Sequence, residues 1–491
     1  MKVLLIPLDD RPITYSYPQL VAKAAGIVPI VPPRTLLGSL SEAAKVEALN
    51  TWVDAAIARE RPSALLLCLD TILYGGLINS RRSEETMRAI ASKLSILKIW
   101  QKNAGPLASI YAQSSIMRIS DNYDPTEEKP YWARFGREIF AWSAQLHRLL
   151  RGDDLPAGVI TAAEYRIPPD IRKDYVATRF RNYQINTKLV ESVASETLRS
   201  LTFSLDDSGE TGLNVMERDK LVALINETNL QSKVFCYAGA DEVLCAMFAR
   251  WLVDTKGKKP GARLHYAVDE AKQCQSRYEG QSIGETITSQ IAACGIELKD
   301  NADFTIIVHA SHRQGDHIQL PGLADLRQID TASAVRSTLK LLEEATTPCA
   351  LIDVAYANGS DPALIEELLK RPELLDKLIS YSGWNTTGNS AGSALALAVA
   401  RWARNTMVRD EALNECLFTR LTDDWAYQAN VRSTIASDTT TGQLAAAMTP
   451  YVKRIAQAMN YQPKALTLSF PWARTFEIEV GIDARVAGVT H

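Results

Sequence analysis

The sequence contains no hydrophobic run long enough to cross a membrane. Its longest apolar stretches, such as Ala64–Leu69 and Phe304–Val308, have the length of strands, well short of the ~20 residues that a spanning helix needs. The apolar start of the chain is also short, and Asp9, Asp10 and Arg11 follow it at once. We therefore interpret this start as a core strand rather than a signal peptide, and we expect no membrane partner.

The chain also lacks a large excess of either positive or negative charge. The 491 residues carry 54 Lys and Arg against 57 Asp and Glu, which leaves a formal net charge of -3. Such a balance gives no electrostatic footprint for nucleic acid, so we expect no nucleic-acid partner. The hydrophobic fraction of 46% and the charged fraction of 23% exclude a disordered chain, a collagen-like fibre and a coiled coil.

Cysteines are few and scattered. There are seven, and no two of them form a Cys-x-x-Cys pair, which disfavours a disulfide framework and a zinc site. A reducing cytoplasm is the simplest location for such a chain. No Gly-x-Gly-x-x-Gly follows the first strand, which argues against a dinucleotide cofactor. We expect neither a metal nor any other cofactor, and self-association stays open.

Short runs rich in Val, Ile and Leu alternate with longer amphipathic segments. This alternation predicts parallel β-α-β architecture, with strands that are buried on both faces. The predicted strands are Val3–Leu8, Ile27–Val31, Ala64–Leu69, Leu107–Tyr111, Leu201–Leu205, Val234–Tyr237, Phe304–His309, Ala350–Val354 and Leu378–Tyr381. The predicted helices include Ser41–Glu60, Ser83–Asn103, Arg134–Arg151, Met216–Asn226, Glu411–Leu421 and Gly442–Ala458.

The pattern predicts an α/β fold and, within that class, a (β/α)8 barrel similar to a TIM barrel over residues 1–405. Residues 406–491 are predicted to form a mainly helical C-terminal appendage that caps the barrel. Nine predicted strands are one more than such a barrel needs. The alternative is an open doubly wound domain, followed by a second α/β domain that begins near Lys256–Arg263.

Polar residues follow the predicted strands at seven places. They are Asp9-Asp10-Arg11, Asp70, Gln113-Ser114, Asp206-Asp207, Asp241-Glu242, Asp353 and Trp384-Asn385. Because the carboxyl ends of parallel strands lie on one side of a sheet, these groups are expected to converge on one site. For each residue alone, an ordinary helix N-cap is the alternative.

The segment Val234–Val243 carries the clearest local signal. An apolar strand runs into Gly239 and Ala240, and two adjacent carboxylates, Asp241 and Glu242, follow before a helix. Small residues allow a ligand to approach the backbone. Crowded carboxylates raise the pKa of one of them, which leaves a protonated acid beside an ionised one, as the cleavage of a glycosidic bond requires.

The other candidate residues are expected to bind the hydroxyl groups of a sugar. Carboxylates accept pairs of hydrogen bonds from hydroxyls, and an aromatic face packs on the C–H face of a pyranose ring. Residues 383–392 offer such a ring among small polar residues. The candidate binding residues are Asp9, Asp10, Arg11, Asp70, Tyr74, Asp206, Asp207, Tyr237, Asp353, Trp384, Asn385 and Asn389.

Four spaced motifs resemble a bacterial family known only as domain of unknown function 4127. They are Leu5–Pro12, Leu205–Gly209, Gly239–Glu242 and Gly383–Asn389, and together they span nearly the whole chain. This resemblance implies no particular activity, so the function must be inferred from the residues.

A second, local resemblance covers about ten residues: the Gly-x-Asp-Glu element at 239–242 is similar to that of the family 20 β-N-acetylhexosaminidases. That resemblance implies that Asp241 orients the 2-acetamido group of the substrate, which attacks the anomeric carbon. It implies that Glu242 is the general acid and base. The leading hypothesis is therefore a retaining exo-glycosidase that acts on a GlcNAc or GalNAc substrate, with a small carbohydrate as its partner.

Two alternatives remain. One is a metal-dependent hydrolase or isomerase, whose oxygen-rich site would be assembled from Asp9, Asp70, Asp206, Asp207, Asp241, Glu242 and His309. The other is a non-catalytic α/β protein that binds sugars.

Overall fold

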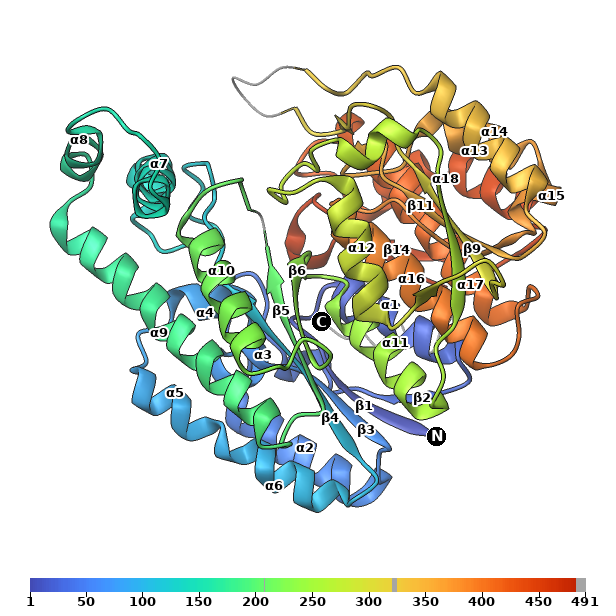
Figure 1. Ribbon diagram of the computed structural model, residues 1–491. Coiled ribbons are helices and arrows are strands. Elements are labelled where there is room, and N and C mark those ends of the chain that lie inside the picture. Colours follow the sequence, from blue (N-terminus) through green and yellow to red (C-terminus); the bar gives the residue numbers. More distant parts are fainter. Residues whose placement is uncertain (207, 320–324, 483–491) are drawn as a thin grey trace. The chain divides into compact units, whose positions relative to one another are not determined.

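A computed structural model describes residues 1–206, 208–319 and 325–482 of the chain. These residues form two compact α/β units, and each has its own parallel sheet (Figure 1). The first unit contains Met1–Asp10, Val28–Met247 and Tyr278–Gln281. The second contains Arg11–Ile27, Phe248–Arg277 and the described part of Ser282–His491.

The first unit is built on a six-stranded sheet with the order β2-β1-β3-β4-β5-β6. All its neighbouring strands are parallel. The strands are β1 (Lys2–Ile6), β2 (Val28–Ile30), β3 (Ala64–Cys68), β4 (Ser109–Ile116), β5 (Ser200–Leu205) and β6 (Val234–Ala238). All six carboxyl ends therefore lie along one edge.

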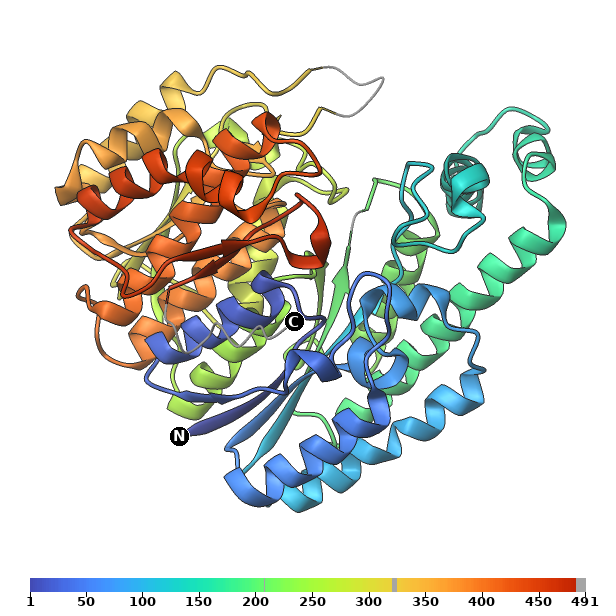
Figure 2. The ribbon, with the colours of Figure 1, turned by 180° about the vertical axis from the view of Figure 1, so that it is seen from behind.

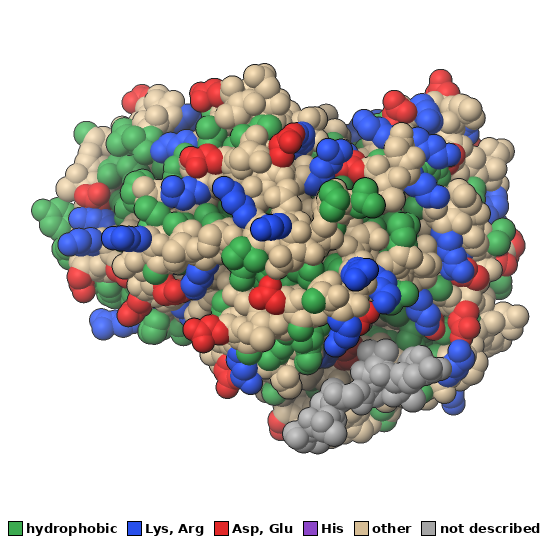
Figure 3. Space-filling view, turned by 90° about the horizontal axis from the view of Figure 1, so that it is seen from below, with side chains coloured by type: hydrophobic (Ala, Val, Ile, Leu, Met, Phe, Trp, Pro, Cys, Tyr) green, Lys and Arg blue, Asp and Glu red, His purple; other side chains and the backbone are tan. Residues whose placement is uncertain are grey.

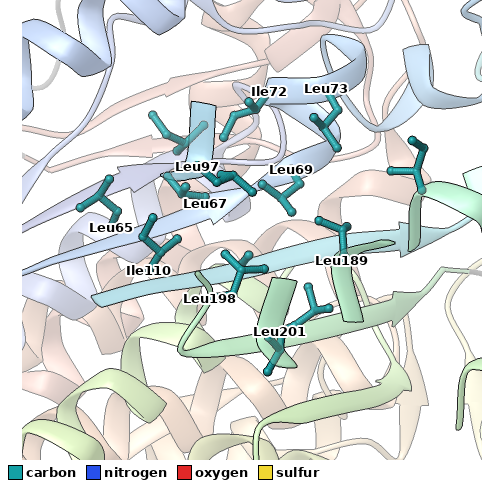
Figure 4. Close-up of a cluster of buried hydrophobic side chains, with 14 of the residues drawn as sticks. Leu65, Leu67, Leu69, Ile72, Leu73, Leu97, Ile110, Leu189, Leu198 and Leu201 are labelled. Atoms are coloured by element: carbon teal, nitrogen blue, oxygen red, sulfur yellow. The ribbon is translucent and has the colours of Figure 1, made fainter. Parts of the chain in front are cut away.

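Helices of the first unit cover one face of this sheet. Side chains that alternate along a strand point to the same face, and Leu65, Leu67, Ile110 and Leu201 pack together with Leu97 in one apolar core (Figure 4). Residues of α2, α5, α6, α9 and α10 complete that core. The helices are α2 (Val46–Glu60), α3 (Leu69–Tyr74), α4 (Leu77–Arg82), α5 (Met87–Lys93), α6 (Ser95–Ala104), α7 (Trp132–Arg151), α8 (Val159–Tyr165), α9 (Pro169–Ala194) and α10 (Leu213–Glu227).

The second unit is built on a five-stranded parallel sheet with the order β13-β11-β9-β7-β8. Every residue of β9, β11 and β13 is buried, as expected for strands covered on both faces. The strands are β7 (Gly261–Tyr266), β8 (Glu297–Leu298), β9 (Phe304–His309), β11 (Cys349–Asp353) and β13 (Leu378–Ser382). Short pairs are formed by β10 (Gly315–Asp316) with β12 (Tyr356–Ala357), and by β14 (Thr467–Ser469) with β15 (Glu479–Gly481).

The helices of the second unit come from distant parts of the sequence. They are α1 (Pro12–Ala24), α12 (Ile283–Cys294), α13 (Ala332–Glu344), α14 (Pro362–Leu369), α15 (Pro372–Leu375), α16 (Thr387–Ala403), α17 (Glu411–Arg420) and α18 (Thr441–Met459). Between α17 and α18 the chain forms a π-helical segment, Leu421–Val431 (η3), a rare geometry that is frequent at functional sites. The segments from α17 onward run from orange to dark red in Figure 2. Helix α11 (Val243–Lys256) is divided in sequence, since residues up to Met247 belong to the first unit and residues from Phe248 to the second.

The described strands do not form the closed (β/α)8 barrel predicted over residues 1–405. Strands β2 and β6 are the two edges of the first sheet, and β7 begins a separate one. The α/β class is confirmed, and the two sheets agree with the alternative of a second α/β domain that begins near Lys256–Arg263. All nine predicted strands are present. The prediction missed β7, because Arg263 and His265 interrupt its apolar residues.

On the face shown in Figure 3, Lys and Arg side chains are interspersed with Asp and Glu. Among the described residues, no helix combines the length and the apolar character that a bilayer span requires.

Candidate functional site

The order of strands reverses between β1 and β3 in the first sheet. From β1 the chain moves to the edge strand β2 and then returns past β1 to β3. In open α/β sheets, ligands bind outside the carboxyl ends of the strands at such a point. Asp9 and Asp10 follow β1 there, and Asp70 follows β3. The Thr71 hydroxyl joins the two ends, because it is 2.7 Å from the Pro7 carbonyl oxygen and 2.9 Å from that of Leu8.

Asp70 is buried and held by its neighbours on β4. Its Oδ2 accepts hydrogen bonds from Gln113 Nε2 at 3.0 Å, from the Ser115 backbone N–H at 2.9 Å and from Ser115 Oγ at 2.8 Å. Burial raises the pKa of Asp70, although these hydrogen bonds and the charge of Arg81 act in the opposite direction. The sequence placed Gln113 after its strand, whereas it lies inside β4, which is longer than predicted.

Asp241 and Glu242 follow β6 and are both buried, with exposed fractions of 7% and 0%. The Gly239 N–H donates to the Leu205 carbonyl oxygen, which ties this turn to β5. The Glu242 carboxylate lies directly over Gly239, because a Cβ added to that glycine would be 2.6 Å from Oε1 and 2.8 Å from Oε2. The absence of a side chain at 239 thus makes room for the Glu242 carboxylate, whereas the sequence analysis expected this room to admit a ligand.

Cys68, the last residue of β3, is buried near these elements. Burial raises the pKa of its thiol well above the usual value, and Asp70, Asp9 and Cys245 raise it further. Cys245 is three residues beyond Glu242, in the first turn of α11. Asp9, Asp70 and Cys245 therefore all lie near enough to Cys68 to affect the pKa of its thiol.

Asp206 is engaged in an ion-pair cluster at the end of β5. Its Oδ2 is 2.8 Å from Arg81 and 3.5 Å from Arg118, and both arginines also pair with Glu128. Arg81 was not identified from the sequence, because its partners lie far away along the chain. Asp207, the next candidate residue, lies outside the described residues.

The two candidate tyrosines of the first unit are enclosed. Tyr74 is 4% exposed, and the Arg181 guanidinium lies 5.5 Å from the centre of its ring. Tyr237, the penultimate residue of β6, is 3% exposed.

Five candidate binding residues belong to the second unit, and they are described there by themselves: Arg11, Asp353, Trp384, Asn385 and Asn389. Trp384 is 1% exposed, and its ring is perpendicular to the Phe476 ring, with the two centres 6.4 Å apart. The Asn385 carbonyl oxygen accepts a hydrogen bond from the Asn358 N–H, and the Asn389 N–H donates to the side chain of the α16 N-cap. Arg11 lies 5.2 Å from the centre of the Trp472 ring.

Asp353 belongs to a buried polar cluster that the sequence did not predict as a unit. Its Oδ2 accepts hydrogen bonds from the Tyr381 hydroxyl at 3.0 Å and from the Asp361 N–H at 2.9 Å. Nearby, Asp424 Oδ2 accepts from the Gly383 N–H at 2.8 Å, and Asp424 Oδ1 pairs with Arg420 at 3.4 Å. Burial raises the pKa of Asp353 to about 6 and that of Asp424 to about 7. Both groups therefore titrate near neutrality.

The residues of the proposed metal site are divided between the units, because His309 belongs to the second and the six acids to the first. His309 Nε2 is 2.9 Å from Asp361 Oδ2, and its Nδ1 is 2.8 Å from Thr338 Oγ1. Over residues 1–206, 208–319 and 325–482, no three His, Cys, Asp or Glu side chains are arranged to hold a metal ion.

Two Gly-x-Ser-x-Gly pentapeptides occur, at 280–284 and 388–392. Ser282 is the N-cap of α12 and accepts a hydrogen bond from the Glu285 N–H, while Ser390 lies inside α16 and donates to the Trp384 carbonyl oxygen. Neither serine sits on the sharp strand-to-helix turn of a hydrolase nucleophile.

A family model described as "Protein of unknown function (DUF4127)" matches residues 3–481. The chain belongs to this family. The match spans almost the entire DUF4127 protein, as the four motifs of the sequence predicted, and it assigns no activity. No curated protein and no solved structure matches the chain. The local resemblance of residues 239–242 to the family 20 hexosaminidases is not shown by these comparisons.

Replacement of Gly239 in the DUF4127 protein tests the fixed position of Glu242. Gly239 has φ 117°, and Gly239→Ala would place Cβ 2.6 Å from Glu242 Oε1. We expect a loss of about 1–3 kcal/mol in the free energy of unfolding, measured by urea denaturation. Gly105→Ala is the matched control, since Gly105 has φ 92° and open space around its Cβ position. Equal losses in both variants would show that Glu242 does not occupy this position.

Proposed function

We propose that the protein is a glycoside hydrolase that releases a terminal 2-acetamido sugar with retention of configuration, as an exo-β-N-acetylhexosaminidase does. The observation that supports this best is the pair Asp241 and Glu242 at the carboxyl end of β6, with the Glu242 carboxylate fixed over Gly239. A carboxyl group without exposed surface is easier to keep protonated than an exposed one, as a general acid requires.

The proposed reaction has two steps. In the first, the acetamido oxygen attacks the anomeric carbon, the bond to the leaving oxygen breaks, and Glu242 gives its proton to that oxygen. Asp241 accepts a hydrogen bond from the acetamido N–H and stabilises the positive charge of the oxazolinium intermediate. In the second, Glu242 takes a proton from water, the water oxygen attacks the anomeric carbon, and the acetamido group is released. Two inversions give retention, and no cofactor is needed.

Asp9, Asp10 and Asp70 are proposed to bind the sugar hydroxyls. They lie at the point of strand reversal, where open α/β sheets bind ligands. Asp9, Asp70 and Cys245 all raise the pKa of the Cys68 thiol, which supports the proximity of the two acids to the segment that carries Glu242.

We also place the protein in the cytoplasm. None of its seven cysteines, all within the described residues, is in a disulfide, and five of them are buried, which fits a reducing compartment.

Asp241→Asn is expected to lower kcat by about 10²–10³-fold on 4-nitrophenyl 2-acetamido-2-deoxy-β-glycosides, with little change in KM. The neutral amide can no longer stabilise the positive charge that develops on the acetamido group. Steady-state rates on the gluco and galacto substrates measure this effect, and the corresponding glycosides without the acetamido group are the control, which the wild type should not cleave. Failure of the wild type to cleave either acetamido substrate would refute the proposed function.

A further inference from the structure

Asp70 is anchored through one oxygen only. All three of its hydrogen bonds, from Gln113 Nε2, the Ser115 N–H and Ser115 Oγ, converge on Oδ2. Within the described residues, Oδ1 accepts no hydrogen bond. An anchored carboxylate with one oxygen left over can receive a donor from a ligand without any rearrangement.

The groups that anchor Asp70 come from two neighbouring strands and form a rigid base. Gln113 Nε2 is 2.8 Å from Ser115 Oγ and 2.9 Å from Ser204 Oγ on β5, and the two hydroxyl oxygens are 3.3 Å apart. Gln113 and Ser204 are completely buried, and Ser115 is 6% exposed. The direction of the Asp70 carboxylate is therefore set by side chains and one backbone N–H of strand residues rather than by a loop.

The charges around this carboxylate restrict the ligand that it can receive. Asp9 and Asp70 act on the same Cys68 thiol, and Arg81, the cation that acts on Asp70, is already paired with Asp206 at 2.8 Å. An ionised Asp70 carboxylate repels an anionic group, such as a sugar phosphate or a uronic acid. A neutral hydroxyl group can donate to Oδ1 without that penalty.

We propose that Gln113, Ser115 and Ser204 are positioning residues that aim Oδ1 of Asp70 at a hydroxyl group of an uncharged 2-acetamido sugar. This inference rests on the proposed function and adds to it a binding contact and a substrate class. It assigns a task to Gln113, Ser115 and Ser204, none of which is among the candidate binding residues identified from the sequence.

Ser115→Ala tests the proposal and Ser115→Thr is its conservative partner, because threonine keeps the hydroxyl and suits a strand. With 4-nitrophenyl 2-acetamido glycosides, Ser115→Ala and Gln113→Met are expected to lower kcat/KM about 10–100-fold, mostly through KM. Ser115→Thr should stay within about 3-fold of the wild type. Ser109→Ala, at the other end of β4, is the control and should be unchanged.

Deoxy analogues separate positioning from a merely structural role. We expect one of the 3-, 4- and 6-deoxy substrates to lose rate with the wild type, and the same analogue to lose markedly less with Ser115→Ala. Equal losses for all analogues in both proteins, or normal kcat/KM in Ser115→Ala, would overturn the inference while the glycosidase proposal stands. If the wild type cleaves no acetamido glycoside, the proposed function fails, and the inference with it. If Gln113→Met does not fold, Ser115→Ala alone decides.

Discussion

Glu242→Gln is expected to lower kcat by about 10²–10⁴-fold on a 2-acetamido glycoside with a poor leaving group, such as a disaccharide. The amide has the shape of the carboxyl group but cannot give a proton to the departing oxygen. A 2,4-dinitrophenyl leaving group needs little protonation. The substitution should therefore slow the cleavage step much less with that substrate. The dependence of kcat/KM on the pKa of the leaving group measures the difference.

The control is Glu227→Gln, an exposed residue at the end of α10, which should behave as the wild type. Loss of activity that is equal for good and poor leaving groups would indicate a structural role of Glu242. Full activity of Glu242→Gln on the disaccharide would place the general acid elsewhere.

Arg420→Met is expected to destabilise the second unit by about 3–5 kcal/mol, because it leaves two buried aspartates without their cation. Arg420 is 2% exposed, 2.8 Å from Asp423 Oδ2 and 3.4 Å from Asp424 Oδ1, and its guanidinium lies 4.9 Å from the centre of the Tyr17 ring. Urea denaturation measures the loss in the free energy of unfolding. Hydrogen exchange of the amides in η3 and β13 shows whether the loss lies in this unit.

The sign of the pH dependence follows from Asp424. Burial raises its pKa to about 7, so the protonated form contributes stability that is complete below the unfolded pKa of about 4 and is lost as the pH rises through about 7. Arg420 lowers the pKa of Asp424, so its removal should cost more at pH 8 than at pH 5. The double variant Arg420→Met/Asp424→Asn should regain part of the loss at pH 8. A loss independent of pH would contradict the buried ion pair.

Much of the fold could be predicted because parallel strands bury both faces and read as apolar runs. Strands β9 and β11 are such runs, and their predicted positions are confirmed. Strand β7 lacks that signal, because Arg263 and His265 lie within it. The prediction of a closed barrel failed for a different reason. Strands and helices alternate in the same way in a barrel and in open sheets, so this pattern does not determine the order of the strands.

Asp241 and Glu242 could be chosen as candidates because they are adjacent in the sequence, but the contact of Glu242 with Gly239 was not predicted. Gly239 and Glu242 are three residues apart, and their close contact is a local property of the turn. Of the groups that hold Asp70, Gln113 was among the polar residues expected to converge with it. Ser115 lies 45 residues away, and Ser204 reaches Asp70 only through Gln113 and Ser115, so neither was predicted. Likewise, Arg81 meets Asp206 across 125 residues, so no short motif signals their ion pair.

A crystal structure of Glu242→Gln with an uncleaved 4-nitrophenyl 2-acetamido glycoside is the most direct measurement of the central claim. We expect the sugar at the carboxyl ends of β1, β3 and β6, with its acetamido N–H bonded to Asp241 and its glycosidic oxygen within hydrogen-bond distance of the amide at 242. A sugar bound elsewhere on the chain, or one whose acetamido group does not touch Asp241, would contradict the account.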